Sequence, residues 1–233
     1  MRDFICDEMR YPENAIKHKI QGTVEVTFTV MPDGSKTNLF IKESVSPELD
    51  AEALRIVSLI LFYPAIKSSN PVIDNYTVPV KFNIKKYERN CKNKGFDNYD
   101  AFTGPIDSSL KIYPTKALTQ APRPVFHEPG MNFPGFIRKN MKYPELAFRQ
   151  NIEGDVELSF VVETSGRISN LEVVNPLGGG CTEEAISLLK QILWQPGTIN
   201  GMAVRSFMTA RINFNLNNNS NHQYLPNNNN TTM

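Results

Sequence analysis

The chain has 233 residues, of which 40% are hydrophobic and 21% charged, and its formal charge at pH 7 is +1. This composition is typical of a globular protein, and the small net charge provides no global field that would attract nucleic acid or an anionic membrane. The three cysteines are an odd number with wide spacing, which excludes a full disulfide framework and offers no metal-binding spacing. We expect unpaired thiols at Cys6, Cys91 and Cys181, with one disulfide as the alternative.

The sequence contains no run of 18 apolar residues, so it predicts no transmembrane segment. The N-terminal stretch MRDFICDEMRYPENAIK also lacks the apolar centre of a signal peptide. We therefore expect this chain, as given, to carry neither an export signal nor a membrane anchor.

The chain contains an internal repeat. Residues 3–84 (repeat 1) and 135–216 (repeat 2) align at a constant offset of 132 without a gap, and 25 of the 82 positions are identical. Residues kept in both copies are expected to be framework, and residues found in one copy are where function can differ. Because each copy is long enough to close its own core, the repeat predicts two domains rather than a solenoid.

Each repeat is predicted to begin with two short helices. The first ends near Met9 or Met141. The second begins at a Tyr-Pro-Glu sequence, where proline suits the first helical turn and the carboxylate lies near the positive helix end. We expect Gly22 or Gly154 to end this second helix.

A hairpin of two strands comes next. Apolar and polar residues alternate over residues 24–30 and 156–162, which predicts a strand with one buried face, and Phe28 and Phe160 share one inward position. Turn residues follow, Pro-Asp-Gly in repeat 1 and Ser-Gly in repeat 2. The second strand has its apolar positions at Leu39 and Ile41, matched by Leu171 and Val173.

A longer helix and a last strand complete each repeat. The helical stripe consists of Ala53, Ile56, Val57, Ile60 and Leu61, matched by Ala185, Leu188, Leu189, Ile192 and Leu193. The last strand alternates up to Ile84 or Leu216. This order predicts an α+β fold, in which each repeat has a three-stranded antiparallel sheet with helices on one face. Such a small sheet has edges that must be covered or used.

These patterns divide the chain into four segments. We predict a first domain over 1–86, a linker with aromatic and Pro-rich parts over 87–125, a second domain over 126–217 and a disordered Asn-rich tail over 218–233. The linker has too many aromatic residues to be fully solvated, so parts of it should pack against a repeat. We expect the two domains to fold independently.

The residues that could carry chemistry do not form a catalytic set. The three histidines lie in different segments without metal spacing, and the glycines at 178–180 are typical of a turn rather than a phosphate loop. Glu52 and Glu184 are expected to compensate a helix dipole. Trp194 takes the position of Phe62 and is expected in the core. We predict no enzymatic activity, no cofactor and no metal.

The basic-aromatic stretch KKYERNCKNK follows repeat 1 at residues 85–94. Acidic residues follow it at once, so we predict no nucleic-acid binding.

The order of these motifs resembles the C-terminal domain of TonB, the energy transducer of bacterial outer-membrane transport. Repeat 2 carries it as YPELAFRQNIEGDVELSFVVETSG, EEA, WQPGTINGMAV and TARINFNL. Repeat 1 carries YPENAIKHKIQGTVEVTFTVMPDG and AEA, and departs afterwards, with Ser69 in place of Gly201. The lead-in PVFHEPGMNFPGFIRKNMKYP is also similar to that of the family, and the resemblance covers about 165 of the 233 residues.

The resemblance implies a non-enzymatic interaction module of the periplasm. In this family a short extended segment of an outer-membrane transporter, the TonB box, pairs with the last strand as an added strand. The family's usual membrane helix and Pro-rich rod are not recognised here. The alternatives are therefore that the protein is cytoplasmic or that the given sequence is truncated at its N-terminus. The alternative function is self-association, in which edge strands pair with each other in a homo-oligomer and no transporter takes part.

The implied partner-binding strand is the last strand of repeat 2. Its outward side chains are Thr209, Arg211, Asn213 and Asn215. Repeat 1 has Pro79 at the position of Arg211, and proline lacks the N–H that an added strand would use at an open edge. We therefore predict that repeat 2, and not repeat 1, captures the partner. In the alternative, the missing N–H faces the paired side and has no effect on binding.

Overall fold

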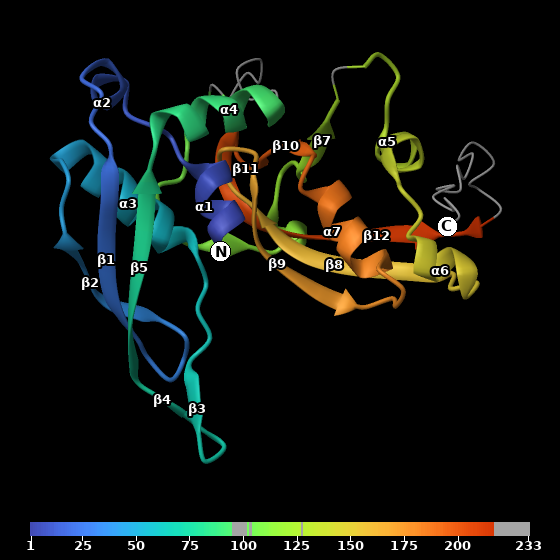
Figure 1. The fold of residues 1–233 in the computed structure, drawn as a ribbon, viewed down its shortest axis with the longest axis horizontal. Coiled ribbons are helices and arrows are strands. Elements are labelled where there is room, and N and C mark those ends of the chain that lie inside the picture. The colour runs from blue at the N-terminus through green and yellow to red at the C-terminus, as the bar shows by residue number, and fades with distance from the viewer. Residues whose placement is uncertain (95–101, 103, 127, 217–233) are drawn as a thin grey trace, which may run out of the picture. The chain divides into compact units, whose positions relative to one another are not determined.

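The computed structural model describes residues 1–94, 102, 104–126 and 128–216 (Figure 1). The chain forms two compact units. The first contains Met1–Arg123, Phe160–Leu171 and Leu193–Met208, and the second contains the described parts of Pro124–Ser159, Glu172–Ile192 and Thr209–Met233. The domain boundaries expected from the repeat stay a prediction, and the predicted tail lies outside the described residues.

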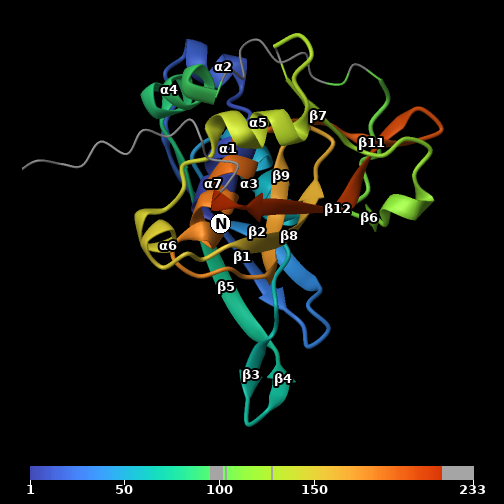
Figure 2. The ribbon, with the colours of Figure 1, turned by 90° about the vertical axis from the view of Figure 1, so that its right-hand side faces the viewer.

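Repeat 1 has the predicted order of elements. Its helices are α1 (Arg2–Glu8), α2 (Glu13–Lys17) and α3 (Pro47–Leu59), and its main strands are β1 (Gly22–Val30), β2 (Lys36–Glu43) and β5 (Asp74–Phe82). The three strands form an antiparallel sheet in the order β2-β1-β5. Two short strands that we did not predict, β3 (Ala65–Lys67) and β4 (Asn70–Val72), form a hairpin that projects beyond the sheet (Figure 2).

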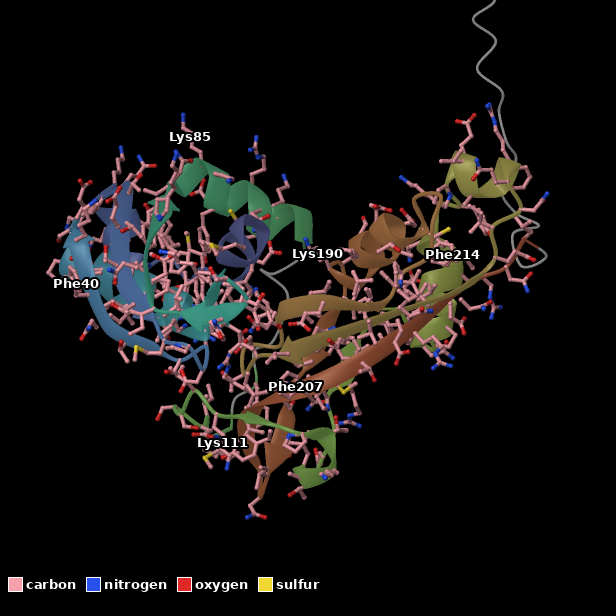
Figure 3. The ribbon with its side chains drawn as sticks, turned by 90° about the horizontal axis from the view of Figure 1, so that it is seen from below. Phe40, Lys85, Lys111, Lys190, Phe207 and Phe214 are labelled. Carbon is pink, nitrogen blue, oxygen red and sulfur yellow. The ribbon has the colours of Figure 1, made fainter. Side chains whose placement is uncertain are left out.

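The core of repeat 1 lies between β1 and α3. All four predicted inward residues of β1 are fully buried, and they pack against the buried stripe of α3. Ser46 caps α3 by accepting the N–H of Leu49 at 3.4 Å. Because the helix ends at Leu59, Leu61 is 44% exposed, so its predicted place on the stripe is wrong. Phe40, on β2, is also exposed (Figure 3).

Gly22 and Gly154 do not end the second helix of each repeat, as we expected. The left-handed residue that follows α2 is Lys19, with a φ of 55°, and its counterpart in repeat 2 is Asn151, with a φ of 51°. Gly22 instead begins β1, where a Cβ atom would lie 2.8 Å from the side chain of Val45. Close packing therefore explains this glycine.

Repeat 2 has the same elements and a larger sheet. Its helices are α5 (Phe133–Asn140), α6 (Glu145–Arg149) and α7 (Cys181–Leu189), and its strands are β8 (Gly154–Val162), β9 (Ile168–Asn175), β10 (Leu193–Gln195), β11 (Gly197–Ile199) and β12 (Met202–Phe214). The sheet order is β11-β12-β8-β9. Beyond the three predicted strands, β11 and β6 (Ile112–Tyr113) also pair with β12.

The predicted core positions of repeat 2 are confirmed for its aromatic residues. Phe160 and Trp194 are buried, and their ring centres lie 5.4 Å apart. The helical stripe was predicted too long, because α7 ends at Leu189 and Leu193 belongs to β10. The three glycines form the predicted turn, since Gly180 is the left-handed N-cap of α7.

Glu52 lies beyond the first turn of α3, so dipole compensation does not explain it. Its carboxylate accepts the main-chain N–H of Arg10 at 2.6 Å. Glu184 does lie in the first turn of α7, as predicted, and it also accepts the main-chain N–H of Lys142 at 2.7 Å. The duplicated glutamate therefore ties the long helix to the segment that precedes the Tyr-Pro-Glu sequence.

The connector contains more structure than its sequence predicts. It includes α4 (Ile84–Lys94), β6, a 3₁₀ turn at Thr115–Ala117 and β7 (Arg123–Val125). Ile84, expected in the last strand, instead begins α4, and β5 ends at Phe82. Tyr87 of α4 packs against the core of repeat 1, which confirms that part of the connector is packed.

Candidate functional site

Among the described residues, the last strand of repeat 2 is open along its second half. β12 pairs with β11 and β6 over its first residues, and the hydroxyl of Thr115 donates to the carbonyl oxygen of Phe207 at 2.7 Å. In the part of the chain that the structure describes, β8 is the only strand paired with residues 208–214. An open strand edge is a template for adding another strand.

Contacts at the start of β12 show which residues face this edge. The N–H of Ala203 donates to the carbonyl oxygen of Pro105 at 2.8 Å, and the carbonyl oxygen of Phe207 accepts from Thr115. Alternate residues of a strand direct their main-chain groups to the same side. We therefore expect every second residue after Phe207, beginning with Thr209, to direct its N–H to the open edge.

Pro79 in repeat 1 supports this assignment. It pairs with Glu25 in a register that runs without interruption along all of β5. A proline is tolerated within such a ladder where the missing N–H faces the unpaired side. Arg211 occupies the equivalent position in β12 and has an N–H to offer there.

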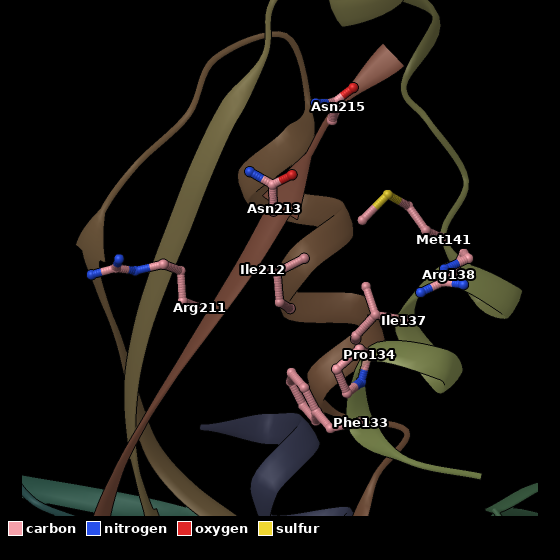
Figure 4. A pocket seen from close by; sticks show the side chains of 9 residues that line it. All are labelled: Phe133, Pro134, Ile137, Arg138, Met141, Arg211, Ile212, Asn213 and Asn215. Carbon is pink, nitrogen blue, oxygen red and sulfur yellow. The ribbon is translucent and has the colours of Figure 1, made fainter. Parts of the chain in front are cut away.

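A groove of about 260 Å³ lies between this edge and α5 (Figure 4). It is lined by Phe133, Pro134, Ile137, Arg138, Met141, Arg211, Ile212, Asn213 and Asn215. Asn132 begins α5 by accepting the N–H of Gly135 at 2.9 Å, and this cap fixes the start of the groove wall. Because Ile137, Met141 and Ile212 are buried, the inner surface is mainly apolar.

Three of the four predicted residues line this groove, and Thr209 does not. The side chain of Arg211 points away from α5 (Figure 4), and its guanidinium lies 3.7 Å from Glu157 and 4.0 Å from Asp155 of β8. Asn213 donates to Asp155 at 2.7 Å. These side chains therefore contact β8, and the main chain of β12 is what the edge offers to a partner.

The equivalent site in repeat 1 is nearly closed. Its cavity has a volume of about 20 Å³ and is lined by Cys6, Met9, Lys81, Asn83, Lys86, Tyr87 and Asn90. The first four residues are equivalent to residues of the groove in repeat 2, and the last three belong to α4. Burial raises the pKa of Tyr87, and Cys91 nearby contributes to this rise. Sequence reasoning missed this difference because it did not predict α4.

Sites of other kinds are not found in the described part of the chain. No group of three or more side chains there could hold a metal ion, and none of the described helices is long and apolar enough to cross a membrane. All three cysteines are thiols.

The family model of the Gram-negative bacterial TonB protein C-terminal domain matches residues 7–84 and 139–216. The two matches fall on the two repeats and together cover more than half of the chain. This family consists of protein-interaction modules of the cell envelope. No curated protein matches the chain.

Proposed function

We propose, since the chain belongs to the TonB C-terminal domain family and carries two tandem copies of it, that repeat 2 binds the TonB box of an outer-membrane transporter. The bound segment would add a strand to β12 in the periplasm, in support of transport. The observation that carries this proposal is the open edge of β12 over residues 208–214, beside the groove of α5.

Strand addition explains how this edge can recognise a partner. Main-chain hydrogen bonds to β12 would supply affinity, and alternate side chains of the added strand would select its sequence. An added strand lies about 4.8 Å from its neighbour, with side chains directed to alternate faces. One set would therefore lie toward the apolar surface of Ile137 and Ile212, and we expect that set to be apolar.

Replacing Arg211 by proline is expected to weaken the binding of a TonB-box peptide several-fold. The substitution removes one main-chain donor from the open edge, and such a hydrogen bond contributes about 0.5–1.5 kcal/mol. The fold should persist, because β5 accommodates Pro79 at the equivalent position. The measurement is a titration of the full chain into a fluorescent synthetic TonB-box peptide, followed by anisotropy.

Arg211→Ala is the matched control, because it removes the same side chain and keeps the N–H. It should bind the peptide as tightly as the wild type. Undiminished binding by Arg211→Pro, or equal losses in both variants, would contradict main-chain recognition at this edge.

The same samples distinguish self-association. Sedimentation of the chain without peptide should show a monomer if the edge is reserved for a partner. A dimer that dissociates when the peptide is added would mean that the edge pairs with a second copy.

A further inference from the structure

The two repeats leave their last strand in the same way. The N–H of Ile84 donates to Gln21 at 2.9 Å, and that of Leu216, the equivalent residue, donates to Glu153 at 2.6 Å. In repeat 1 the chain continues as α4, which Asn83 caps by accepting a main-chain N–H at 2.9 Å. In repeat 1 the segment after the strand therefore lines the groove.

α4 covers the groove of repeat 1 through a few contacts. Tyr87 packs on Tyr11, with their ring centres 5.5 Å apart. The side-chain amide of Asn90 donates to the carbonyl oxygen of Cys6 in α1 at 3.0 Å. Cys91, which lies one helical turn after Tyr87, is buried. The groove of repeat 2 has a volume of about 260 Å³, whereas the equivalent cavity beside α4 in repeat 1 has a volume of about 20 Å³.

The composition of α4 suits a helix that can detach from the core of repeat 1. The helix has 11 residues, and six of them carry a charge. A helix of this length is marginal on its own in water, so its position depends on its contacts with the rest of repeat 1, among them those of Ile84, Tyr87, Asn90 and Cys91. Elements with few buried contacts can open locally without global unfolding.

We propose that α4 is a detachable cover over a second partner-binding edge, formed by β5 in repeat 1. Among the residues that the structure describes there is then one open groove, in repeat 2, and one in repeat 1 that becomes available when α4 moves away. The second edge takes the same class of extended segment, more weakly, because Pro79 offers no N–H. This proposal rests on the proposed function for its ligand, whereas the cover can be tested without one.

The first test uses the thiols of the full chain. Cys91 lies on α4 and Cys181 lies in α7, and both are buried. A thiol reagent in excess, with its sites mapped by mass spectrometry over time, should modify Cys91 faster than Cys181. Asn90→Ala should increase the modification rate of Cys91 about fivefold, because one hydrogen bond that holds α4 is lost, and should leave the rate of Cys181 unchanged.

Two more variants complete this test. Tyr87→Ala should increase the modification rate of Cys91 further. If Tyr87→Ala does not fold, Asn90→Ala alone is the test variant. Lys85→Ala, a change at an exposed residue of the same helix (Figure 3), should leave the rate unchanged. A modification rate of Cys91 that stays unchanged in Asn90→Ala and Tyr87→Ala would show that these contacts do not hold α4 in place, and would overturn the proposal.

The second test counts binding sites with the synthetic TonB-box peptide. Calorimetric titration should give one equivalent for the wild type and a second, weaker one for Tyr87→Ala. One equivalent in a variant whose Cys91 has become reactive would overturn the second site. Absence of binding by every form would contradict the proposed function instead, and the thiol rates would still decide whether α4 is a cover.

Discussion

Replacing Arg205 by alanine is expected to destabilise the first compact unit by about 3–5 kcal/mol, because the change leaves a buried carboxylate without its counter-charge. The side chains of Arg205 and Glu163 are 3% and 2% exposed. Nε and Nη2 of Arg205 donate to the two carboxylate oxygens at 2.7 and 2.9 Å. The guanidinium also donates to the carbonyl oxygens of Leu59 and Leu110, so its loss leaves several acceptors unsatisfied.

Urea unfolding followed by the fluorescence of Trp194, which lies in the same unit, measures this effect. Arg211→Ala is the control, because this arginine is 65% exposed and its ion pairs are long, so about 1 kcal/mol or less is expected. The double variant Arg205→Met/Glu163→Leu removes both charges and should recover most of the stability. A loss below about 1 kcal/mol in Arg205→Ala would contradict the role given to this pair.

The repeat made much of the framework predictable, because residues kept in both copies have duplicated structural roles. The hydroxyl of Tyr11 donates to the carbonyl oxygen of Ile20 at 2.7 Å, and Tyr143 makes the same contact in repeat 2 at 2.7 Å. Asn38 and Asn170 are identical in the two copies as well. The reason is visible only in the backbone, where both residues are left-handed, with φ of 53° and 49°.

The elements that distinguish the repeats were harder to predict. α4 has apolar residues at only three positions of a charged segment, Ile84, Tyr87 and Cys91. Their spacing is helical, but so few apolar residues directly after a strand pattern are a weak signal. The contrast between Pro79 and Arg211 could be found in the sequence. The groove could not, since it depends on how α5 packs beside β12.

The pairing of Arg205 with Glu163 could not be predicted from the sequence for a related reason. Each appears in the sequence as an ordinary polar residue, and 42 positions separate them. Alternation along a strand predicts which face a residue occupies, but it does not predict that a polar residue on that face finds a buried partner. Long-range ion pairs of this kind need the tertiary structure.

Replacing Phe28 or Phe160 by alanine is expected to cost about 3–5 kcal/mol, on the scale of buried aromatic truncations. Both side chains are fully buried. The ring of Phe28 lies 4.7 Å from that of Phe62, and Phe160 lies 5.4 Å from Trp194, so each substitution leaves a cavity beside another aromatic ring. Because a domain of this size is stable by only about 5 kcal/mol or slightly more, either variant should be close to unfolding at room temperature.

Thermal unfolding followed by circular dichroism measures both variants, and Trp194 fluorescence should respond directly to Phe160→Ala. Phe40→Ala is the matched control, because this ring on β2 is 52% exposed and its removal should change the free energy of unfolding by about 0.5 kcal/mol or less. A shift equivalent to under about 1 kcal/mol in Phe28→Ala would place its ring on the solvent side of β1. Since one residue of slip moves every side chain to the other face, that result would also displace the register of β5, and with it the assignment of Pro79 to the open edge.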